Sequence, residues 1–336
     1  MASTLSSQKQ ALRSRLKQAV AALPPVQRRR EAAALFYSLL RCEAFARART
    51  VMLYASLPDE ADTHSWPASL QELGKRVVLP VVVGDGLELR EYVDDASLRP
   101  GAYHILEPQG PAFTDLSAVD LVVVPGVGFD AAGHRLGRGR GYYDRFLSQP
   151  ALSHAYKVGC AFSCQVVAEV PVEPHDFAVH ALLDPHLVPA EEPASLPPFY
   201  AGLLLPLPVH ADARGSLVAV ATQAVPPVGH AVDRVFWITG VPHGQSRGFH
   251  AHRSCHEVLF CLRGSLTVHL DDGRHPAVAY RLSSPAEGLR IPPMYWCELT
   301  DFSADALCLC LASGAYDHDG YIETYDSFLA TVRAGR

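Results

Sequence analysis

Three glycines alternate with three arginines in one short segment of the chain. RLGRGRGYYDRFL, residues 135–147, follows the apolar run VVVPG and leads into a helical pattern. Glycines let the backbone turn tightly and present its N–H groups, and the start of a helix favours an anion. Guanidinium groups form paired hydrogen bonds to phosphate oxygens. We therefore expect a phosphate-binding loop here, the alternative being a solvated basic turn.

Two further charged positions fit a nucleotide site. Lys9 and Arg13 are four residues apart in a helical pattern, so their side chains share one face. A bound anion would offset their mutual repulsion, although a solvated helix surface explains the pair equally well. Asp144 stands just inside the helix that follows the glycine loop. Near phosphates, an acidic side chain at this place suits a Mg²⁺ ion.

Two histidines in the second half are spaced for joint chemistry. In GQSRGFHAHRSCHEVLFCLRG, residues 244–264, His250 and His252 flank one alanine, and Glu257 follows. Residues two apart on a strand point to the same side, so both imidazoles face one pocket. The spacing is typical of the first cupin motif, in which metal cupins add a later histidine. Cys297 stands about where that histidine would come. A metal site with a soft fourth ligand and metal-free proton chemistry both remain open.

The elements that must position the first site alternate between helix and strand. Apolar stripes predict helices over about 6–23 and 28–47, and unbroken apolar runs begin at Val51, Arg76, Asp120 and Tyr156. Runs of this kind are typical of buried parallel strands. We expect an α/β domain over 1–187 with a wound, mostly parallel sheet, whose ligands lie beyond the carboxyl ends of the strands.

The pattern of the sequence changes after a proline-rich stretch at 188–205, which we interpret as a linker. From there on, short strand patterns alternate with turns, and LTVHLDDG predicts a hairpin. The expected second domain, 206–336, is an all-β cupin barrel (a jelly roll) with a C-terminal helix over about 320–333.

Composition excludes several classes of function. The 336 residues carry a net charge of −6, which gives no reason to expect a nucleic-acid partner. No stretch of about twenty apolar residues indicates a membrane span. The eight cysteines show no CxxC spacing and the N-terminus lacks a secretory pattern, so we expect a cytoplasmic enzyme with reduced thiols.

The segment VVVPGVGFDAAGHRLGRGRGYYDRFL resembles the signature of the 5-formyltetrahydrofolate cyclo-ligases, also called methenyltetrahydrofolate synthetases. KQALR at 9–13, LPDEADT at 57–63, GAYHILEP at 101–108 and VPVEPHDFAVHALLD at 170–184 agree in order. The resemblance implies that ATP phosphorylates the formyl oxygen of 5-formyltetrahydrofolate, after which ring closure gives 5,10-methenyltetrahydrofolate. One departure is the tail of the last motif, where His180 and Asp184 stand.

The same resemblance implies roles for individual residues. It assigns Mg²⁺ to Asp144 and Asp176, and the reduced folate to Glu60, Arg138 and Tyr142. ATP would be held by Lys9, Arg13, Arg135, Gly137, Arg138, Gly139, Arg140, Gly141, Tyr142 and Tyr143. The alternative is an inactive nucleotide- or folate-binding module.

The second half resembles the WxcM-like sugar cupins, the TDP-4-oxo-6-deoxyhexose 3,4-ketoisomerases. The motifs are RGSLVAVA from Arg214, RVFWITG from Arg234, SSPAEGLRIPPMYW at 283–296 and YDHDGYIETYDSFLA at 316–330. The resemblance implies a homodimer that moves a ketone from C4 to C3 of a TDP-sugar without a cofactor.

In this reading His250 is the principal base and His252 its partner, because imidazole, with a pKa of about 6.5, accepts and donates protons near neutrality. Arg214, Arg234 and Arg247 are expected to bind the sugar nucleotide. The family often has a tyrosine where Phe236 stands. The rival interpretation is a metal-dependent cupin, either an oxygenase or a sensor.

Overall fold

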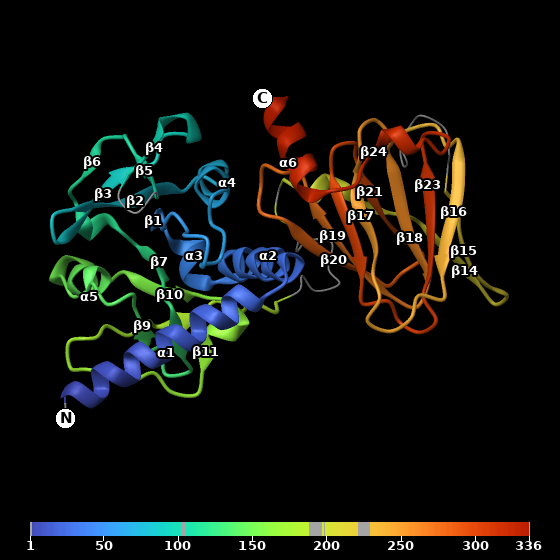
Figure 1. Ribbon diagram of the computed structural model, residues 1–336. Helices are drawn as coiled ribbons and strands as arrows, with labels where there is room; N and C mark the ends of the chain where they lie inside the picture. The colour runs from blue at the N-terminus through green and yellow to red at the C-terminus, as the bar shows by residue number, and fades with distance from the viewer. Residues whose placement is uncertain (1, 102–104, 188–196, 198, 221–228, 336) are drawn as a thin grey trace. The chain divides into compact units, whose positions relative to one another are not determined.

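The computed structural model describes residues 2–101, 105–187, 197, 199–220 and 229–335. The chain divides into two compact units, Met1–Leu187 and Val188–Arg336 (Figure 1). Part of the predicted linker (188–196 and 198), residues 102–104 of the GAYHILEP landmark and residue 221 of a predicted strand lie outside the described residues.

The N-terminal unit is built on a seven-stranded sheet. Its strands from β10 through β2 are parallel, β12 joins them in parallel, and β3 and β6 add an antiparallel edge. β1 and β7 are buried along their whole length, as expected for strands covered on both faces. The prediction of a mostly parallel α/β sheet is confirmed. In spatial order the strands are β12 (Ala181–Leu182), β10 (Tyr156–Cys160), β7 (Leu121–Pro125), β1 (Thr50–Met52), β2 (Arg76–Val83), β3 (Gly86–Glu91) and β6 (Ala112–Phe113).

Helix α1 (Ala2–Ala22) follows the predicted amphipathic pattern. Its buried stripe of Leu12 and Leu16 packs against Val127, Leu136 and Val170. These partners belong to, or flank, a small sheet of β11 (Val166–Val167), β8 (Gly128–Asp130) and β9 (Arg135–Leu136). The helix therefore lies beside the glycine-rich segment, which begins in β9.

The helix expected over 28–47 is two helices, α2 (Pro25–Arg41) and α3 (Glu43–Arg47). Cys42 between them has an extended backbone, which interrupts the helical hydrogen bonds. α4 (Trp66–Glu72) follows β1, and the Trp66 ring contacts Phe36 of α2 edge-on at a centroid distance of 5.2 Å. A short antiparallel pair, β4 (Leu98–Pro100) and β5 (Leu106–Pro108), lies outside the main sheet.

The C-terminal unit consists of two five-stranded sheets with an apolar core drawn from both, so the predicted all-β architecture is confirmed. α6 (Tyr325–Ala334) packs on the outer face of the second sheet through Phe328 and Val332. One sheet is β13 (Leu204–Pro206), β21 (Glu287–Ile291), β18 (Glu257–Arg263), β23 (Leu307–Ala312) and β16 (Arg234–Thr239). The other is β20 (Val278–Leu282), β19 (Leu266–Asp271), β22 (Trp296–Thr300), β17 (Arg247–His252) and β24 (Tyr321–Ile322).

Two boundaries differ from the sequence-based expectation. Residues 199–205 of the expected linker pack into the C-terminal unit, because Tyr200 is fully buried in the core and β13 pairs with β21. Apolar burial of the segment's aromatic and leucine side chains outweighs the loop tendency of its prolines. The final helix begins at Tyr325 rather than near 320, because Tyr321 and Ile322 form a strand first.

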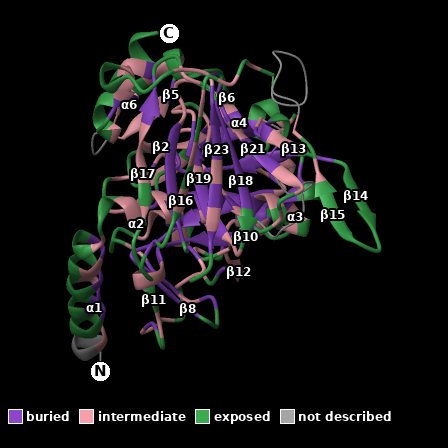
Figure 2. Ribbon diagram, turned by 90° about the vertical axis from the view of Figure 1, so that its right-hand side faces the viewer, coloured by how far each residue is buried: buried purple, intermediate pink, exposed green. Residues whose placement is uncertain are grey.

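A hairpin of β14 (Val209–Asp212) and β15 (Gly215–Val218) projects from the barrel and pairs with no other described strand. Figure 2 shows it as exposed over almost its whole length, in contrast to the buried strands of the barrel. Among the described residues, no helix has the length and apolar character needed to cross a lipid bilayer.

Candidate active sites

The glycine-rich loop runs from β9 to α5 (Tyr142–Leu147) and is bound by a side chain of α1. Gly139 and Gly141 have φ angles of 97° and 67°, a region that favours glycine, so the turn requires glycine at these two positions. The Arg13 Nε donates to the carbonyl oxygen of Gly137 at 2.8 Å. Because α5 has only six residues, the positive charge of this site comes mainly from side chains.

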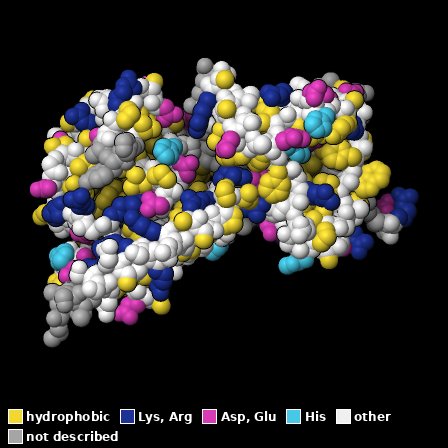
Figure 3. Space-filling view, viewed as in Figure 1, with side chains coloured by type: hydrophobic (Ala, Val, Ile, Leu, Met, Phe, Trp, Pro, Cys, Tyr) yellow, Lys and Arg dark blue, Asp and Glu magenta, His cyan; other side chains and the backbone are white. Residues whose placement is uncertain are grey.

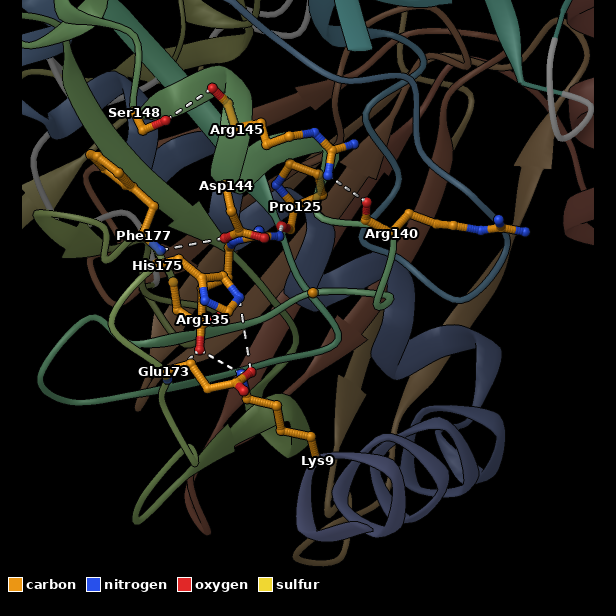
Figure 4. Close-up of polar contacts among 12 residues, drawn as sticks. Lys9, Pro125, Arg135, Arg140, Asp144, Arg145, Ser148, Glu173, His175 and Phe177 are labelled. Atoms are coloured by element: carbon orange, nitrogen blue, oxygen red, sulfur yellow. Dashed lines mark hydrogen bonds and ion pairs between the residues drawn. The ribbon is translucent and has the colours of Figure 1, made fainter. Parts of the chain in front are cut away.

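Lys9, one turn before Arg13, is paired with two carboxylates. Its Nζ lies 2.7 Å from Glu173 Oε2 and 2.5 Å from Asp176 Oδ2, as Figure 4 shows for Glu173. The Lys9 side chain is only 9% exposed. Burial disfavours its charge, but the two carboxylates outweigh this and raise the pKa of Lys9. Burial acts against the charge of Asp176 as well, yet the ion pair with Lys9 lowers the pKa of Asp176.

Arg135, at the start of the loop, is also paired with a carboxylate. Its Nη2 lies 2.7 Å from Asp144 Oδ1, and both side chains are largely buried. The backbone N–H of Phe177, the residue after Asp176, also donates to Asp144 Oδ1 at 3.4 Å (Figure 4). The two predicted metal ligands, Asp144 and Asp176, therefore come from adjoining segments.

The same region offers a set of ligand atoms for a cation. One ligand atom each from Glu173, His175 and Asp176 lies within 4.8 Å of the others. Carboxylate oxygens are the ligands that Mg²⁺ prefers, and Asp144 adds a further one close by. The residues present thus fit the Mg²⁺ ion that the cyclo-ligase resemblance implies.

Arg138 joins the loop to the segment after β1. Its guanidinium binds both oxygens of Asp59, at 2.5 and 3.1 Å, and Glu60 Oε1 at 2.8 and 3.1 Å. Burial raises the pKa of Glu60, and Arg138 offsets only part of that effect. A carboxylate held this way in a partly apolar wall is suited to accept hydrogen bonds from a ligand with adjacent N–H donors.

A cavity of about 440 Å³ opens between the loop and the sheet, which is the size range of small-molecule sites, about 300–1,000 Å³. Its apolar wall includes Pro80, Val82, Leu87 and Ile105. On the face of the N-terminal unit drawn in Figure 3, Lys and Arg side chains gather with acidic side chains between them. Nine predicted site residues line the cavity: Glu60, Arg135, Gly137, Arg138, Arg140, Gly141, Tyr142, Tyr143 and Asp144.

Four predicted residues lie beside this cavity rather than in its wall. Gly139 is part of the same loop, Arg13 holds that loop, and Lys9 binds Asp176. Sequence reasoning missed Asp59, Glu173 and His175. Asp59 lies in LPDEADT and the other two in VPVEPHD, so a search of those segments for charged residues would have found them.

In the C-terminal unit, β17 presents the two histidines toward the interior of the barrel. A bulge between Gly248 and His250 interrupts its pairing with β22, and Phe249 takes a positive φ of 63°. Such bulges re-aim side chains next to functional sites. Phe249 and Ala251 pack outward against the cluster that contains α6. The rings of His250 and His252 therefore share the inner face, with their centroids 4.9 Å apart.

Glu257 and Arg234 complete the inner wall. The His252 Nε2 lies 3.3 Å from Glu257 Oε1, without the geometry of a hydrogen bond, and Arg234 Nη2 lies 3.8 Å from the same oxygen. Burial opposes ionisation of Glu257, but His252, His250 and Arg234 together lower its pKa. Burial, reinforced by the nearby His252, lowers the pKa of His250. His250 is thus held in the neutral form that a base requires.

Two polar atoms in this wall make no hydrogen bond with any described residue, the Nε of Arg234 and the Nε2 of His252. Both are buried, so each carries a desolvation cost that a bound ligand would relieve. One ligand atom each from His250, His252 and Glu257 lies within 4.8 Å of the others, a group that also suits a divalent metal.

Cys297 was expected to stand where metal cupins have their last histidine. It pairs with His250 across the ladder and is buried in the core. It is not part of the group of ligand atoms formed by the two histidines and Glu257 among the described residues. Burial raises the pKa of the Cys297 thiol far above its usual range, so the thiolate that metals prefer is disfavoured.

The three predicted arginines are placed differently. Arg234 is partly buried beside Glu257, and Arg247 is exposed at the start of β17. Arg214 lies in the turn of the projecting hairpin, 89% exposed and paired with Asp212. The structure therefore brings Arg234 to the histidines but does not bring Arg214 to them within one chain.

Comparison with known proteins matches each unit to a separate family. The model of the 5-formyltetrahydrofolate cyclo-ligase family matches residues 5–185, and the model described as "WxcM-like, C-terminal" matches residues 203–333. A TDP-4-oxo-6-deoxy-alpha-D-glucose-3,4-oxoisomerase from Aneurinibacillus thermoaerophilus is 44% identical over 35% of this chain and 82% of that protein. The chain belongs to both families.

The relatives of the first unit are similar over most of their length. A 5-formyltetrahydrofolate cyclo-ligase from Escherichia coli K12 is 35% identical over 42% of this chain and 80% of that protein. One from Mus musculus is 29% identical over 54% of this chain and 95% of that protein. The chain thus carries a cyclo-ligase unit followed by a sugar oxoisomerase unit, as the two resemblances predicted.

Proposed function

We propose that the chain is a bifunctional enzyme. Its N-terminal unit converts 5-formyltetrahydrofolate and ATP to 5,10-methenyltetrahydrofolate, and its C-terminal unit isomerises a TDP-4-oxo-6-deoxyhexose to the 3-oxo sugar. The family memberships support both activities. In each unit, one observation carries the proposal: the paired charges around the glycine loop, and the two imidazoles side by side in the barrel.

In the N-terminal unit, two of the cations expected to bind ATP are already paired with carboxylates. Lys9 binds Glu173 and Asp176, and Arg135 binds Asp144. The ATP phosphates can replace the carboxylates as partners of Lys9 and Arg135, while Asp144 and Asp176 would hold Mg²⁺. This exchange of partners leaves no buried charge alone, which would otherwise be costly.

The remaining residues position the reaction. Arg13 fixes the loop backbone, and Glu60 with Arg138 lies at the cavity wall where the folate ring system is expected. Phosphoryl transfer is catalysed mainly by positioning and charge neutralisation, and bound Mg²⁺ supplies part of that neutralisation. We expect Tyr142, Tyr143 and the apolar cavity wall to exclude water from the activated formyl group.

Incubation with 5-formyltetrahydrofolate and Mg-ATP tests this activity through the absorbance of the methenyl product. Asp144→Asn should weaken the binding of Mg-ATP and abolish product formation. The exposed Asp85 provides a control, since Asp85→Asn should leave both unchanged. A wild-type protein that binds Mg-ATP but forms no product would identify the unit as an inactive nucleotide-binding module.

In the C-terminal unit, the neutral His250 is positioned to take the proton from C3 of the sugar and to return one at C4. Moving the proton through an enediol exchanges the carbonyl between the two carbons. His252 lies beside it, and the ionised Glu257 stabilises the His250 imidazolium that forms. The partly buried Arg234 can stabilise the negative charge that develops on the oxygen at C4. The exposed Arg247 is available for the diphosphate.

We propose that this chemistry needs no metal. The buried, protonated thiol of Cys297 leaves the histidine pair without a fourth protein ligand in the described part of the unit. Elemental analysis of the purified protein checks this point. Stoichiometric metal that disappears in Glu257→Gln would instead favour a metal-dependent cupin, either an oxygenase or a sensor.

A homodimer through the C-terminal unit is also proposed. β16 lies at the edge of its sheet, and its outward-facing Val235 and Trp237 are 52% and 64% exposed. The projecting hairpin exposes Leu217 in addition. Exposed apolar side chains at an unpaired strand edge are typical of an interface. Light scattering should show a dimer that Trp237→Ser converts to a monomer. All eight cysteines are free thiols, in keeping with the cytoplasmic location that we propose.

A further inference from the structure

Isomerisation of a 4-oxo sugar requires two proton movements. One proton leaves C3 and another arrives at C4, which an imidazole can perform. In addition, the oxygen at C4 must gain a proton and the hydroxyl at C3 must lose one. Phe236, at the position where the family often has a tyrosine, carries no group that can do this. The proton that moves between the two oxygens must therefore be carried by another group in the wall of the barrel.

Tyr321 lies directly opposite His252 in the ladder between β24 and β17. Its neighbour Ile322 packs outward into the cluster that contains α6, so the Tyr321 ring shares the inner face with the histidines. Its centroid lies 4.8 Å from that of His250 and 4.4 Å from that of His252. The ring is thus in contact with both members of the proposed acid–base pair.

Tyr321 and Phe236 meet at the same guanidinium. Arg234 lowers the pKa of the Tyr321 phenol, and its guanidinium lies 5.2 Å from the centroid of the Phe236 ring. Burial raises the pKa of Tyr321 and Arg234 counteracts the rise, so the phenol is protonated near neutrality and its anion is stabilised when it forms. This combination suits a group that donates a proton and takes one back.

We propose that the Tyr321 hydroxyl carries the proton between the two oxygens of the sugar, in place of the tyrosine absent at position 236. The inference rests on the proposed isomerase activity and names a further residue of that site. As His250 removes the hydrogen of C3, Tyr321 donates its proton to the oxygen at C4, which gives the enediol. The Tyr321 oxygen then takes the proton of the C3 hydroxyl, while the His250 imidazolium protonates C4. C3 is oxidised, C4 is reduced, and both side chains return to their starting states.

Tyr321→Phe tests the proposal, because it removes one oxygen and keeps the ring that packs on both histidines. We expect kcat to fall about 100-fold, the lower range for a positioned proton donor, with the affinity for TDP unchanged. Tyr316→Phe is the matched control. Tyr316 also lies near Arg234, but it is 67% exposed, and its variant should keep the wild-type rate.

A second variant separates proton transfer from support of Arg234. Adding Phe236→Tyr to Tyr321→Phe places a hydroxyl on the ring whose centroid lies 5.2 Å from the same guanidinium, and we expect it to restore at least tenfold of the lost rate. The proposal is overturned if Tyr321→Phe keeps the wild-type kcat, if its TDP affinity falls as much as its kcat, or if the double variant regains nothing. A wild-type protein that leaves the TDP-4-oxo sugar unchanged would refute the proposed isomerase itself.

Discussion

The two units solve the problem of buried charge in opposite ways. Around the glycine loop, the cations Lys9 and Arg135 are each held by carboxylates before any ligand arrives. In the barrel, the base His250 is instead kept neutral by burial and by its neighbour His252. Fixed charges suit the binding of a polyanion and a cation together, whereas a neutral imidazole suits the transfer of protons.

This difference predicts which changes should inactivate each site. The first site depends on exchange of ion-pair partners. Its activity should therefore fall when a protein cation such as Lys9, or the bound metal ion, is removed. The second depends on proton affinity, so it should be sensitive to pH and to the loss of a single imidazole. Four experiments test this difference between the two sites.

Removal of divalent metal should separate the units most strongly. With excess EDTA, we expect the cyclo-ligase reaction to stop completely, because the ATP phosphates and the carboxylates of Asp144 and Asp176 would repel one another. The isomerase rate, measured in the same sample, should not change. An isomerase rate that falls with EDTA and returns with added metal would show that the barrel also uses an ion.

Replacement of His250 should give the next largest effect. We expect His250→Asn to lower the isomerase kcat about 1,000-fold, within the range for loss of a general base, and to leave the cyclo-ligase rate unchanged. His243→Asn, at an exposed loop position before the motif, is the control. A loss of less than tenfold in His250→Asn would assign the base to another residue.

Removal of Lys9 should affect both function and stability of the N-terminal unit. Lys9→Met leaves Glu173 and Asp176 without their cation, and because Glu173 is partly exposed we expect a loss of about 2 kcal/mol in the free energy of unfolding. ATP affinity should fall about tenfold as well. Lys17→Met, which changes an exposed lysine of the same helix, provides the control in chemical denaturation and calorimetry. Equal stability of the two variants would contradict the ion-pair account.

The dependence of the isomerase on pH is a smaller effect with a definite sign. A base works in its neutral form, and the pKa of His250 is lowered from 6.5, so the neutral form persists to lower pH. The acidic limb of kcat/KM should therefore lie below pH 6.5, as measured across a constant-ionic-strength buffer series. A limb above that value would mean that a carboxylate, not burial, controls the base.

The sequence predicted the framework of both sites, because their key residues lie in short contiguous motifs. The residues of the glycine loop and the pair His250 and His252 need only local backbone geometry to come together. The buried strands followed from unbroken apolar runs. These patterns each lie within one short segment, so they can be recognised from the sequence alone.

What escaped prediction depends on contacts between distant segments. Tyr321 is 69 positions beyond His252 and joins the site only because β24 pairs with β17. Glu173 reaches Lys9 across 164 positions. Arg214 was assigned to the sugar site from its motif, yet it lies exposed in a hairpin whose position the local pattern does not determine. Strand pairing, rather than residue type, decides these cases.

Proton transfer by His250 can be observed directly in the isomerised sugar. The protein is given TDP-4-oxo-6-deoxyglucose in deuterated water, and the product is followed by NMR. We expect a 3-oxo sugar that is formed by the wild type and not by His250→Asn. C4 carries deuterium in those turnovers in which the His250 imidazolium exchanges its proton with the solvent. A 3-oxo product that appears equally fast with His250→Asn would contradict the account, and so would the absence of any 3-oxo product from the wild type.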